Sequence, residues 1–227
     1  RVNSMGYRAS EAAIYSPDLI FLGDSATMGW GVSEQARFSD IVADKLGVKV
    51  LNAAVSSYGT ARALLGASRL DLSSVHTVII QYCSNDDLEN REFVLWGGSL
   101  VRASPSLYSE LSERIRAAVG YYPGRHTMEL FPLLIHRLLF GGQNQEGGFT
   151  ASDGREAEYF LRTLEYFERQ LLGKRIIVME IGQYFGEQSS FMPSLREQLK
   201  EQRGCAICQK MELLDLSKVL SRNSYFL

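Results

Sequence analysis

The sequence has no excess of one charge and no long hydrophobic run. It carries 24 Lys and Arg against 26 Asp and Glu, a net charge of −2, and so lacks the basic footprint of nucleic-acid binding. Its longest apolar stretch, residues 130–140, is interrupted by Pro132, His136 and Arg137 and is too short and too polar to span a bilayer. We therefore expect no nucleic-acid partner and no membrane span within this chain.

Cysteine is scarce, with Cys83, Cys205 and Cys208 among the 227 residues. The last two have the spacing of half a zinc site or of a redox pair, but the sequence offers no second pair of ligands. We expect inert thiols or a local disulfide and no metal; metal or redox chemistry of this pair is the alternative. Cys83 closes an apolar strand and is expected to pack rather than react. Residues 29–31 lack the glycine spacing that cradles phosphates, so we expect no cofactor.

The residues that are present favour one α/β domain. The chain is 45% hydrophobic and 22% charged, the composition of a soluble globular protein. Five short, β-rich apolar runs punctuate it, at residues 18–24, 48–53, 75–83, 175–181 and 212–216. The near-continuous apolar character of residues 78–80 is typical of parallel strands covered on both faces.

Helical patterns fall between these runs. The first extends from an N-cap at Ser33 to a stop at Gly47, and its inward face is expected to hold Phe38, Ile41, Val42 and Leu46. Residues 60–70 and 194–202 predict two more helices. Another lies within 156–172, is closed by Gly173, and has an inward stripe of Phe160, Leu164, Phe167 and Leu171. This alternation predicts a flavodoxin-like three-layer α/β/α sandwich with a central five-stranded parallel sheet.

Residues 87–153 do not fit the alternation. They are predicted to form an insertion between the third and fourth strands of a single domain that comprises residues 1–227. An apolar helical pattern at 128–140 precedes a flexible connector at 141–148. Insertions at the active edge of such sheets often shape substrate access, so one interpretation is a lid. A structural flap or an oligomer contact is the other, and the sequence gives no oligomeric state.

One serine stands at a turn suited to catalysis. Gly23, Asp24 and Ser25 follow the apolar run 19–22, which predicts a buried strand ending in a tight turn that presents the serine. The helix that follows would point its free N–H groups at any oxyanion nearby. Ser25 is therefore well placed to be a nucleophile.

Polar residues follow the next two strands as well. Ser57 lies in the turn after the second strand, and Asn85 and Asp86 lie in the turn after the third. In a parallel sheet all three turns emerge at the same edge, so we expect these residues to converge on Ser25. A serine hydrolase site requires convergence of this kind.

These motifs carry a resemblance to a known family. The pattern Gly-Asp-Ser-x-Thr-x-Gly at 23–29 resembles the first block of the SGNH (GDSL-type) serine hydrolases, and residues 85–86 are similar to the third. The second block matches more loosely, with Ser57 where the family has glycine. The resemblance covers most of the chain and implies that Ser25 is catalytic. It implies an oxyanion hole made by the N–H groups of Ser25 and Ser57 and by the Asn85 side chain, with a serine at 57 tolerable if its φ allows it.

The same resemblance assigns supporting roles. Asp24 is expected to bond the turn backbone, and Asp86 either does the same or contacts substrate. Cys83 replaces the glycine that the family has in its third block. Residues 3–8 look like a segment that precedes this domain in some bacterial members, which are often exported or membrane-anchored upstream. The resemblance thus implies export or an anchor upstream of residue 1.

The family's Asp-x-x-His block is missing. Asp215 and Lys218 imitate its spacing, but the chain ends at Leu227 with no histidine there, and we expect it to be cut shortly before the block. His76 is predicted at the sheet edge opposite Ser25, whereas His126 and His136 lie in the insertion. All three are expected to have surface or packing roles.

The resemblance implies a serine esterase or deacylase that acts through an acyl-enzyme on Ser25. Its substrate would be a small-molecule or carbohydrate ester, such as an O-acylated carbohydrate. Two alternatives stay open. In an O-acyltransferase a sugar hydroxyl would replace water in the second step, and a catalytically inactive binding module would keep the pocket without the base.

Overall fold

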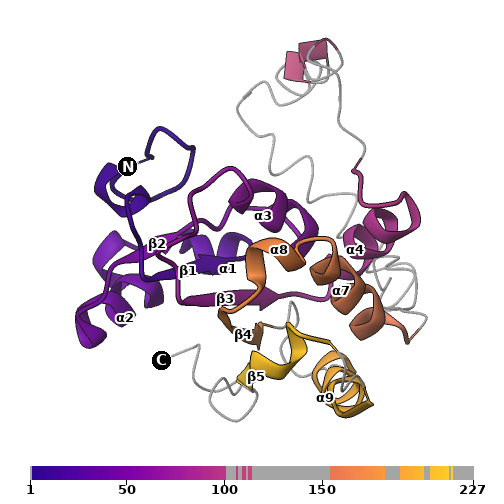
Figure 1. Ribbon diagram of the computed structural model, residues 1–227. Coiled ribbons are helices and arrows are strands. Elements are labelled where there is room, and N and C mark those ends of the chain that lie inside the picture. The colour runs from indigo at the N-terminus through magenta and orange to yellow at the C-terminus, as the bar shows by residue number, and fades with distance from the viewer. Residues whose placement is uncertain are drawn as a thin grey trace, which may run out of the picture. The chain divides into compact units, whose positions relative to one another are not determined.

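Figure 1 shows the computed structural model of the chain. It describes residues 2–100, 106, 109, 110, 112, 113, 154–181, 190–201, 205–214 and 216. Val101–Ala151 form a compact unit of their own, and the sheet belongs to the other unit, Arg1–Leu100 with Ser152–Leu227. The helical pattern at 128–140 and the connector at 141–148, which carry the lid interpretation, lie outside the described residues.

A parallel sheet forms the centre of the described fold. Its five strands are β1 (Leu19–Leu22), β2 (Val50–Asn52), β3 (Thr77–Tyr82), β4 (Arg175–Glu180) and β5 (Met211–Leu214). Their order is β2-β1-β3-β4-β5, and every neighbouring pair is parallel. Each strand overlaps a predicted apolar run, and the predicted sheet is confirmed. Strand order reverses between β1 and β3, the place where doubly wound folds bind ligands.

Helices cover both faces of this sheet (Figure 1). They are η1 (Glu11–Ile14), α1 (Ser25–Met28), η2 (Glu34–Ala36), α2 (Phe38–Leu46), α3 (Thr60–Ala67), α4 (Asp86–Leu95), α7 (Glu156–Glu165), α8 (Glu168–Leu171), α9 (Phe191–Glu201) and η3 (Cys208–Lys210). On one face, Ile20 and Val178 pack with residues of α3, α7 and α9 in a large core. On the other, Phe21 packs with Phe38 and Val42 of α2 in a smaller one. The three layers match the predicted sandwich.

The start of α2 differs from the prediction. Ser33 is the N-cap of η2 rather than of α2. Arg37 is extended, with φ −71° and ψ 138°, and it separates the two helices, so α2 begins only at Phe38. The helix ends as predicted at Gly47, which adopts φ +64°.

The inward face of α2 is also narrower than predicted. Phe38 and Val42 pack on the sheet, and the Phe38 ring meets Phe21 edge-on with 5.3 Å between ring centroids. Ile41 and Leu46, predicted to face inward, are 40% and 64% exposed. The smaller core on this face accommodates only part of the apolar stripe of the helix.

On the opposite face the predicted stripe is buried, although its helix is interrupted. Phe160, Leu164, Phe167 and Leu171 are all buried, but the chain breaks between residues 165 and 168 into α7 and α8. α3 ends at Ala67, before the predicted end at 70, and α9 begins at Phe191, before the predicted start at 194. Most of α4 falls in the segment that the sequence assigns to the insertion, and its buried Phe93 stacks on Phe167.

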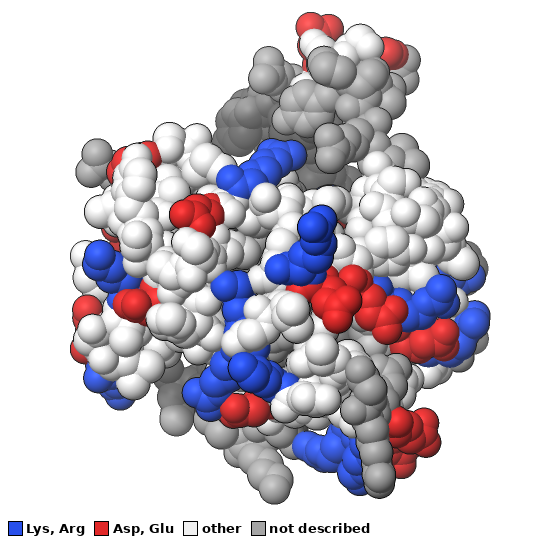
Figure 2. All heavy atoms as spheres, viewed as in Figure 1, with Lys and Arg blue, Asp and Glu red and all other residues white. Residues whose placement is uncertain are grey.

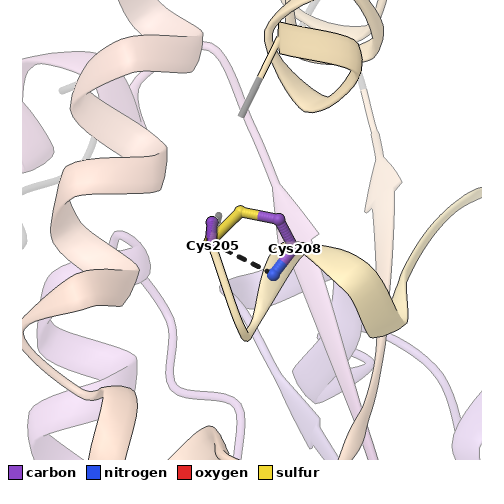
Figure 3. Close-up of a disulfide and its surroundings, with 2 residues drawn as sticks. All are labelled: Cys205 and Cys208. Carbon is purple, nitrogen blue, oxygen red and sulfur yellow. Dashed lines mark hydrogen bonds between the residues drawn. A yellow bond between two sulfur atoms is a disulfide. The ribbon is translucent and has the colours of Figure 1, made fainter. Parts of the chain in front are cut away.

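Cys205 and Cys208 form a disulfide between α9 and β5 (Figure 3). The N–H of Cys208 donates a hydrogen bond to the Cys205 sulfur at 3.2 Å. Of the two expectations for this pair, the local disulfide is the one observed. Cys83 is a free, buried thiol, and burial, with the nearby charges of Asp24 and Asp86, raises its pKa to about 12. A raised pKa disfavours the reactive thiolate, and the burial of Cys83 fits the packing role predicted for it.

Candidate functional site

Three turns lie side by side at the carboxyl edge of the sheet, because β1 is flanked by β2 and β3. Pairing continues beyond the strands: the N–H of Ala53 donates to the Phe21 carbonyl at 2.9 Å, and the N–H of Val55 donates to the Gly23 carbonyl at 3.1 Å. The turn that carries Ser57 is thereby fixed beside the turn that carries Ser25. The turn with Asn85 follows β3 on the other side of β1.

Ser25 is the first residue of α1 and is half-buried. Asp24 is the N-cap, and its Oδ1 accepts a hydrogen bond from the Ala26 N–H at 2.8 Å. This is the backbone bond expected of a carboxylate that supports the turn. Gly29 ends the short helix with φ +73°. The serine hydroxyl has no hydrogen-bond partner within the described part of the chain, which leaves it available for chemistry.

An arginine near the N-terminus holds the far end of α1. The Arg8 guanidinium donates to the carbonyls of Met28, Gly29 and Val32, the last at 2.6 Å. The Arg8 carbonyl in turn accepts a hydrogen bond from the guanidinium of Arg37. Sequence reasoning identified residues 3–8 only as a resemblance. The structure shows that this segment packs against the element that carries Ser25.

Ser57 has an unusual backbone. Its φ is +64°, in the left-handed region that residues other than glycine rarely adopt. The condition set by the sequence, that a serine here needs a suitable φ, is therefore met with a geometry typical of glycine. Such outliers persist only where the surrounding structure enforces them, and they cluster at functional sites.

Carboxylates of α4 hold the loop that carries Ser57. The Glu89 carboxylate accepts hydrogen bonds from the N–H groups of Gly59 at 3.3 Å and Arg62 at 2.9 Å, and it pairs with the Arg62 guanidinium. The Thr60 hydroxyl donates to the Asp86 carboxyl at 2.9 Å. Asp86, a candidate for either backbone support or substrate contact, is only 2% exposed, and its side chain bonds α3 in this structure.

Asn85 is the residue that precedes α4, and its side chain makes no capping hydrogen bond. Its Oδ1 is buried and lacks a partner among the described residues. The amide is therefore not used to build its own turn, the commonest structural role of an asparagine in such a position. Within the described ranges the Nδ2 group makes no hydrogen bond either.

Burial sets the electrostatics of this edge. Desolvation raises the pKa of the Asp86 carboxyl well above its usual value; the hydrogen bond from Thr60 opposes this rise, and the charges of Asp24 and Glu89 add to it. A raised pKa favours the neutral carboxyl, which limits the negative charge at this edge of the sheet. Elsewhere charges are mixed, and on the face shown in Figure 2 basic and acidic side chains are interspersed.

The histidines do not supply a base in the described region. His76 lies just before β3 at the amino edge of the sheet, opposite Ser25, and is exposed. His126, His136, Asp215 and Lys218 lie outside the described residues. Within the described ranges no group of three His, Cys, Asp or Glu side chains is arranged to hold a metal ion. No described helix is both long and apolar enough to cross a bilayer.

No protein-family model matches the sequence, and no curated protein matches it. Solved structures similar to the chain include AlinE4, an SGNH-hydrolase family esterase, at 14% identity and a TM-score of 0.45, over 93% of this chain and 83% of that one. An acetyl xylan esterase, Est2A, from the rumen bacterium Butyrivibrio proteoclasticus is 15% identical with a TM-score of 0.48, over 88% and 55%. A family two carbohydrate esterase from Clostridium thermocellum is 12% identical with a TM-score of 0.45, over 87% of this chain and 53% of that one. At these values the likeness assigns neither an activity nor a site residue to this chain.

Proposed function

We propose that the protein is a serine-dependent ester hydrolase in which Ser25 is the nucleophile. The observation that carries this proposal is the backbone of Ser57, a serine held at φ +64° in the turn beside Ser25. The cost of that geometry is explained if the Ser57 N–H has to point at a ligand. With the Ser25 N–H and the Asn85 amide it forms the proposed oxyanion hole.

The reaction follows from these roles. The Ser25 hydroxyl oxygen attacks the carbonyl carbon of the ester, and its proton passes to a general base, the role that a histidine fills in the resembled family. The carbonyl oxygen takes up negative charge and is stabilised by the three donors. The C–O bond to the alcohol then breaks, the alcohol leaves with a proton, and water releases the acyl group from Ser25.

The substrate class that we favour is an O-acylated carbohydrate. Trp30 is 78% exposed, and its backbone N–H donates to the Ser25 carbonyl at 3.0 Å, so the backbone that carries this aromatic side chain lies close to the proposed nucleophile. Tyr58 directly follows Ser57 and is half-buried. Aromatic rings beside polar turns supply apolar contact area, which suits the faces of sugar rings.

The test is hydrolysis of p-nitrophenyl acetate by the full-length protein beside its Ser25→Ala variant. We expect the variant to lose at least about 1,000-fold in kcat, since removal of the nucleophile removes the covalent route. Ser33→Ala, at an exposed serine whose side chain makes no capping bond, is the matched control and should keep full activity. Folded protein without turnover, or turnover that is indifferent to Ser25, would overturn the proposal.

Mass spectrometry of the intact protein separates the alternatives. An acetyl group that accumulates on Ser25 and leaves only when a sugar acceptor is added would indicate an O-acyltransferase. Absence of any acylation, with retained binding of the ester, would indicate an inactive binding module. Rapid acylation followed by release in water alone supports the hydrolase.

A further inference from the structure

A buried amide lies directly beneath the turn that carries Ser25. Gln81, near the end of β3, is 1% exposed. Its Oε1 accepts two hydrogen bonds, one from the Asp24 N–H at 3.0 Å and one from the Thr27 hydroxyl at 3.0 Å. These donors lie on either side of Ser25 in the sequence, one residue before it and two after it.

An amide at this position is poorly explained by stability alone. β3 is a central strand whose other residues beyond Thr77 are buried and mostly apolar, and a polar group there is costly unless it is fully bonded. Only half of the Gln81 amide is satisfied, because its Nε2 is buried with no partner among the described residues. An apolar side chain of similar shape would avoid that cost. We therefore attribute the presence of an amide at this position to the two groups that its oxygen binds, the Asp24 N–H and the Thr27 hydroxyl.

Neighbouring residues are fitted to this oxygen. A Cβ atom at Gly23 would lie 2.5 Å from the Gln81 Oε1, so the glycine makes room for the amide. Thr27 is fully buried, and its carbonyl accepts a hydrogen bond from the Asn52 Nδ2 at 2.6 Å. β2 and β3 thus hold Thr27 from two sides, through its carbonyl and its hydroxyl.

We propose that Gln81 is a positioning residue for the nucleophile. Through the Asp24 N–H and the Thr27 hydroxyl it fixes the orientation of the first turn of α1, and with it the direction of the Ser25 hydroxyl and N–H. The inference rests on the proposed function, in which Ser25 attacks an ester. Its physical basis is that a nucleophile displaced by about 1 Å can lose about 100-fold in rate although binding is unchanged.

The experiment compares variants of the full-length protein that keep shape and remove hydrogen bonds. Gln81→Met removes the acceptor, Thr27→Val removes one donor, and Thr27→Ser keeps that donor. With p-nitrophenyl acetate we expect Gln81→Met to lower kcat by about 10- to 100-fold with KM nearly unchanged. Thr27→Val should lower kcat by less, and Thr27→Ser should restore most of it.

Two further measurements separate positioning from a general loss of stability. Ile79→Val alters the same strand on the same face, away from the turn, and should lower the melting temperature without changing kcat. The double variant Gln81→Met with Thr27→Val should lose less kcat than the product of the single losses, because both singles break one shared hydrogen bond.

The outcomes distinguish the two proposals. Ser25-dependent turnover with an unchanged kcat in Gln81→Met, or with full additivity in the double variant, overturns the role of Gln81 and leaves that of Ser25 intact. A folded wild-type protein without Ser25-dependent turnover overturns both. The positioning role is supported if Gln81→Met and Thr27→Val lower kcat at nearly constant KM while Thr27→Ser keeps most of the wild-type kcat.

Discussion

The two turns that would serve the oxyanion are held by different chemistry. The Ser25 turn rests on neutral amides, with Gln81 bonding Asp24 and Thr27 from β3, and Asn52 bonding Thr27 from β2. The Ser57 turn rests on the carboxyl groups of Asp86 and Glu89, which bond the first turn of α3. The buried anchors of the first turn are neutral amides, beside the Asp24 carboxylate that caps it, whereas the second turn is held by carboxyl groups and carries the positive φ.

The two turns would meet different requirements of the proposed reaction. A nucleophile at Ser25 would need a fixed direction, and the buried amides of Gln81 and Asn52 contribute to it with groups that do not titrate. An oxyanion donor at Ser57 would need an N–H aimed at the ligand, and here that residue has a positive φ and lies in a turn held by carboxyl groups. We therefore expect changes at the Ser25 turn to affect geometry and rate, and changes at the Ser57 turn to affect the pH response and local strain.

Of the changes at the two turns, we expect Gly23→Ala to lower the free energy of unfolding most. A Cβ at Gly23 would lie 2.5 Å from the Gln81 Oε1 and 2.9 Å from the Thr27 hydroxyl, at a φ of +156° that L-residues rarely adopt. We expect a loss of about 3 kcal/mol in the free energy of unfolding, measured by urea denaturation, with kcat reduced as well.

Gly59→Ala is the matched change at the other turn. There a Cβ would meet the Glu89 carboxylate at 2.8 Å, but that group ends a side chain that can shift, and the backbone has no positive φ. Its cost should be smaller than that of Gly23→Ala. Equal losses in the two variants would contradict the view that the Ser25 turn is the more rigid of the two.

Asp86→Asn should change how the free energy of unfolding depends on pH, an effect that we expect only at the Ser57 turn. Because the pKa of Asp86 is raised in the folded state, the folded protein binds more protons than the unfolded chain above the ordinary value of 3.8. Stability contributed by this group is therefore fully present below that value and is lost as pH rises toward the raised pKa, by about 1.4 kcal/mol for each pKa unit. Asparagine keeps an acceptor for the Thr60 hydroxyl and should flatten this decline.

The measurement is the free energy of unfolding between pH 4 and pH 8 for wild type, Asp86→Asn and the control Asp44→Asn, which alters an exposed residue of α2. Only Asp86→Asn should change the slope. An unchanged slope would mean that the anchor of the Ser57 turn does not titrate in this range. Variants of Gln81 should leave the slope as it is in wild type.

Ser57→Gly should have the smallest effect. Glycine removes about 1 kcal/mol of left-handed strain but loses about 0.5–1 kcal/mol to the greater freedom of the unfolded chain, so we expect a net change of less than about 1 kcal/mol. Since the proposed donor is a backbone N–H, kcat should be kept. Ser57→Val, which is β-branched, should destabilise the protein clearly, and a tolerated valine would argue against the strained geometry.

Much of the fold follows from local sequence signals. Continuous apolar runs located the strands, and Gly47 and Gly173 marked helix ends. The exposure of Ile41 and Leu46 could not be predicted, because it depends on how much apolar surface the second face of the sheet offers to α2. Ser33 has the residue type of an N-cap, but it caps η2. The extended Arg37 interrupts the helical backbone, so α2 begins one residue later, at Phe38.

The site was predictable only in part. The positions of Ser25, Ser57 and Asn85 at one edge follow from parallel strands, whereas the φ of Ser57 is a tertiary property. Arg8 gave no signal, since its carbonyl partners lie 20 to 24 positions away. Gln81 did give a sequence signal, because it is a polar residue within the apolar run 75–83 and a buried amide requires a hydrogen-bond partner.

The hydrogen bond between the Asp24 N–H and Gln81 has a consequence for biosynthesis, because it joins residues 57 positions apart. A chain emerging from the ribosome presents its N-terminal part first, and contacts of long sequence separation form late. Ser25 is therefore synthesised well before Gln81, the residue that we propose positions it. Until β3 has paired with β1, a nascent chain carries the proposed nucleophile without its final geometry, and we expect reactivity toward esters only once the central sheet has assembled.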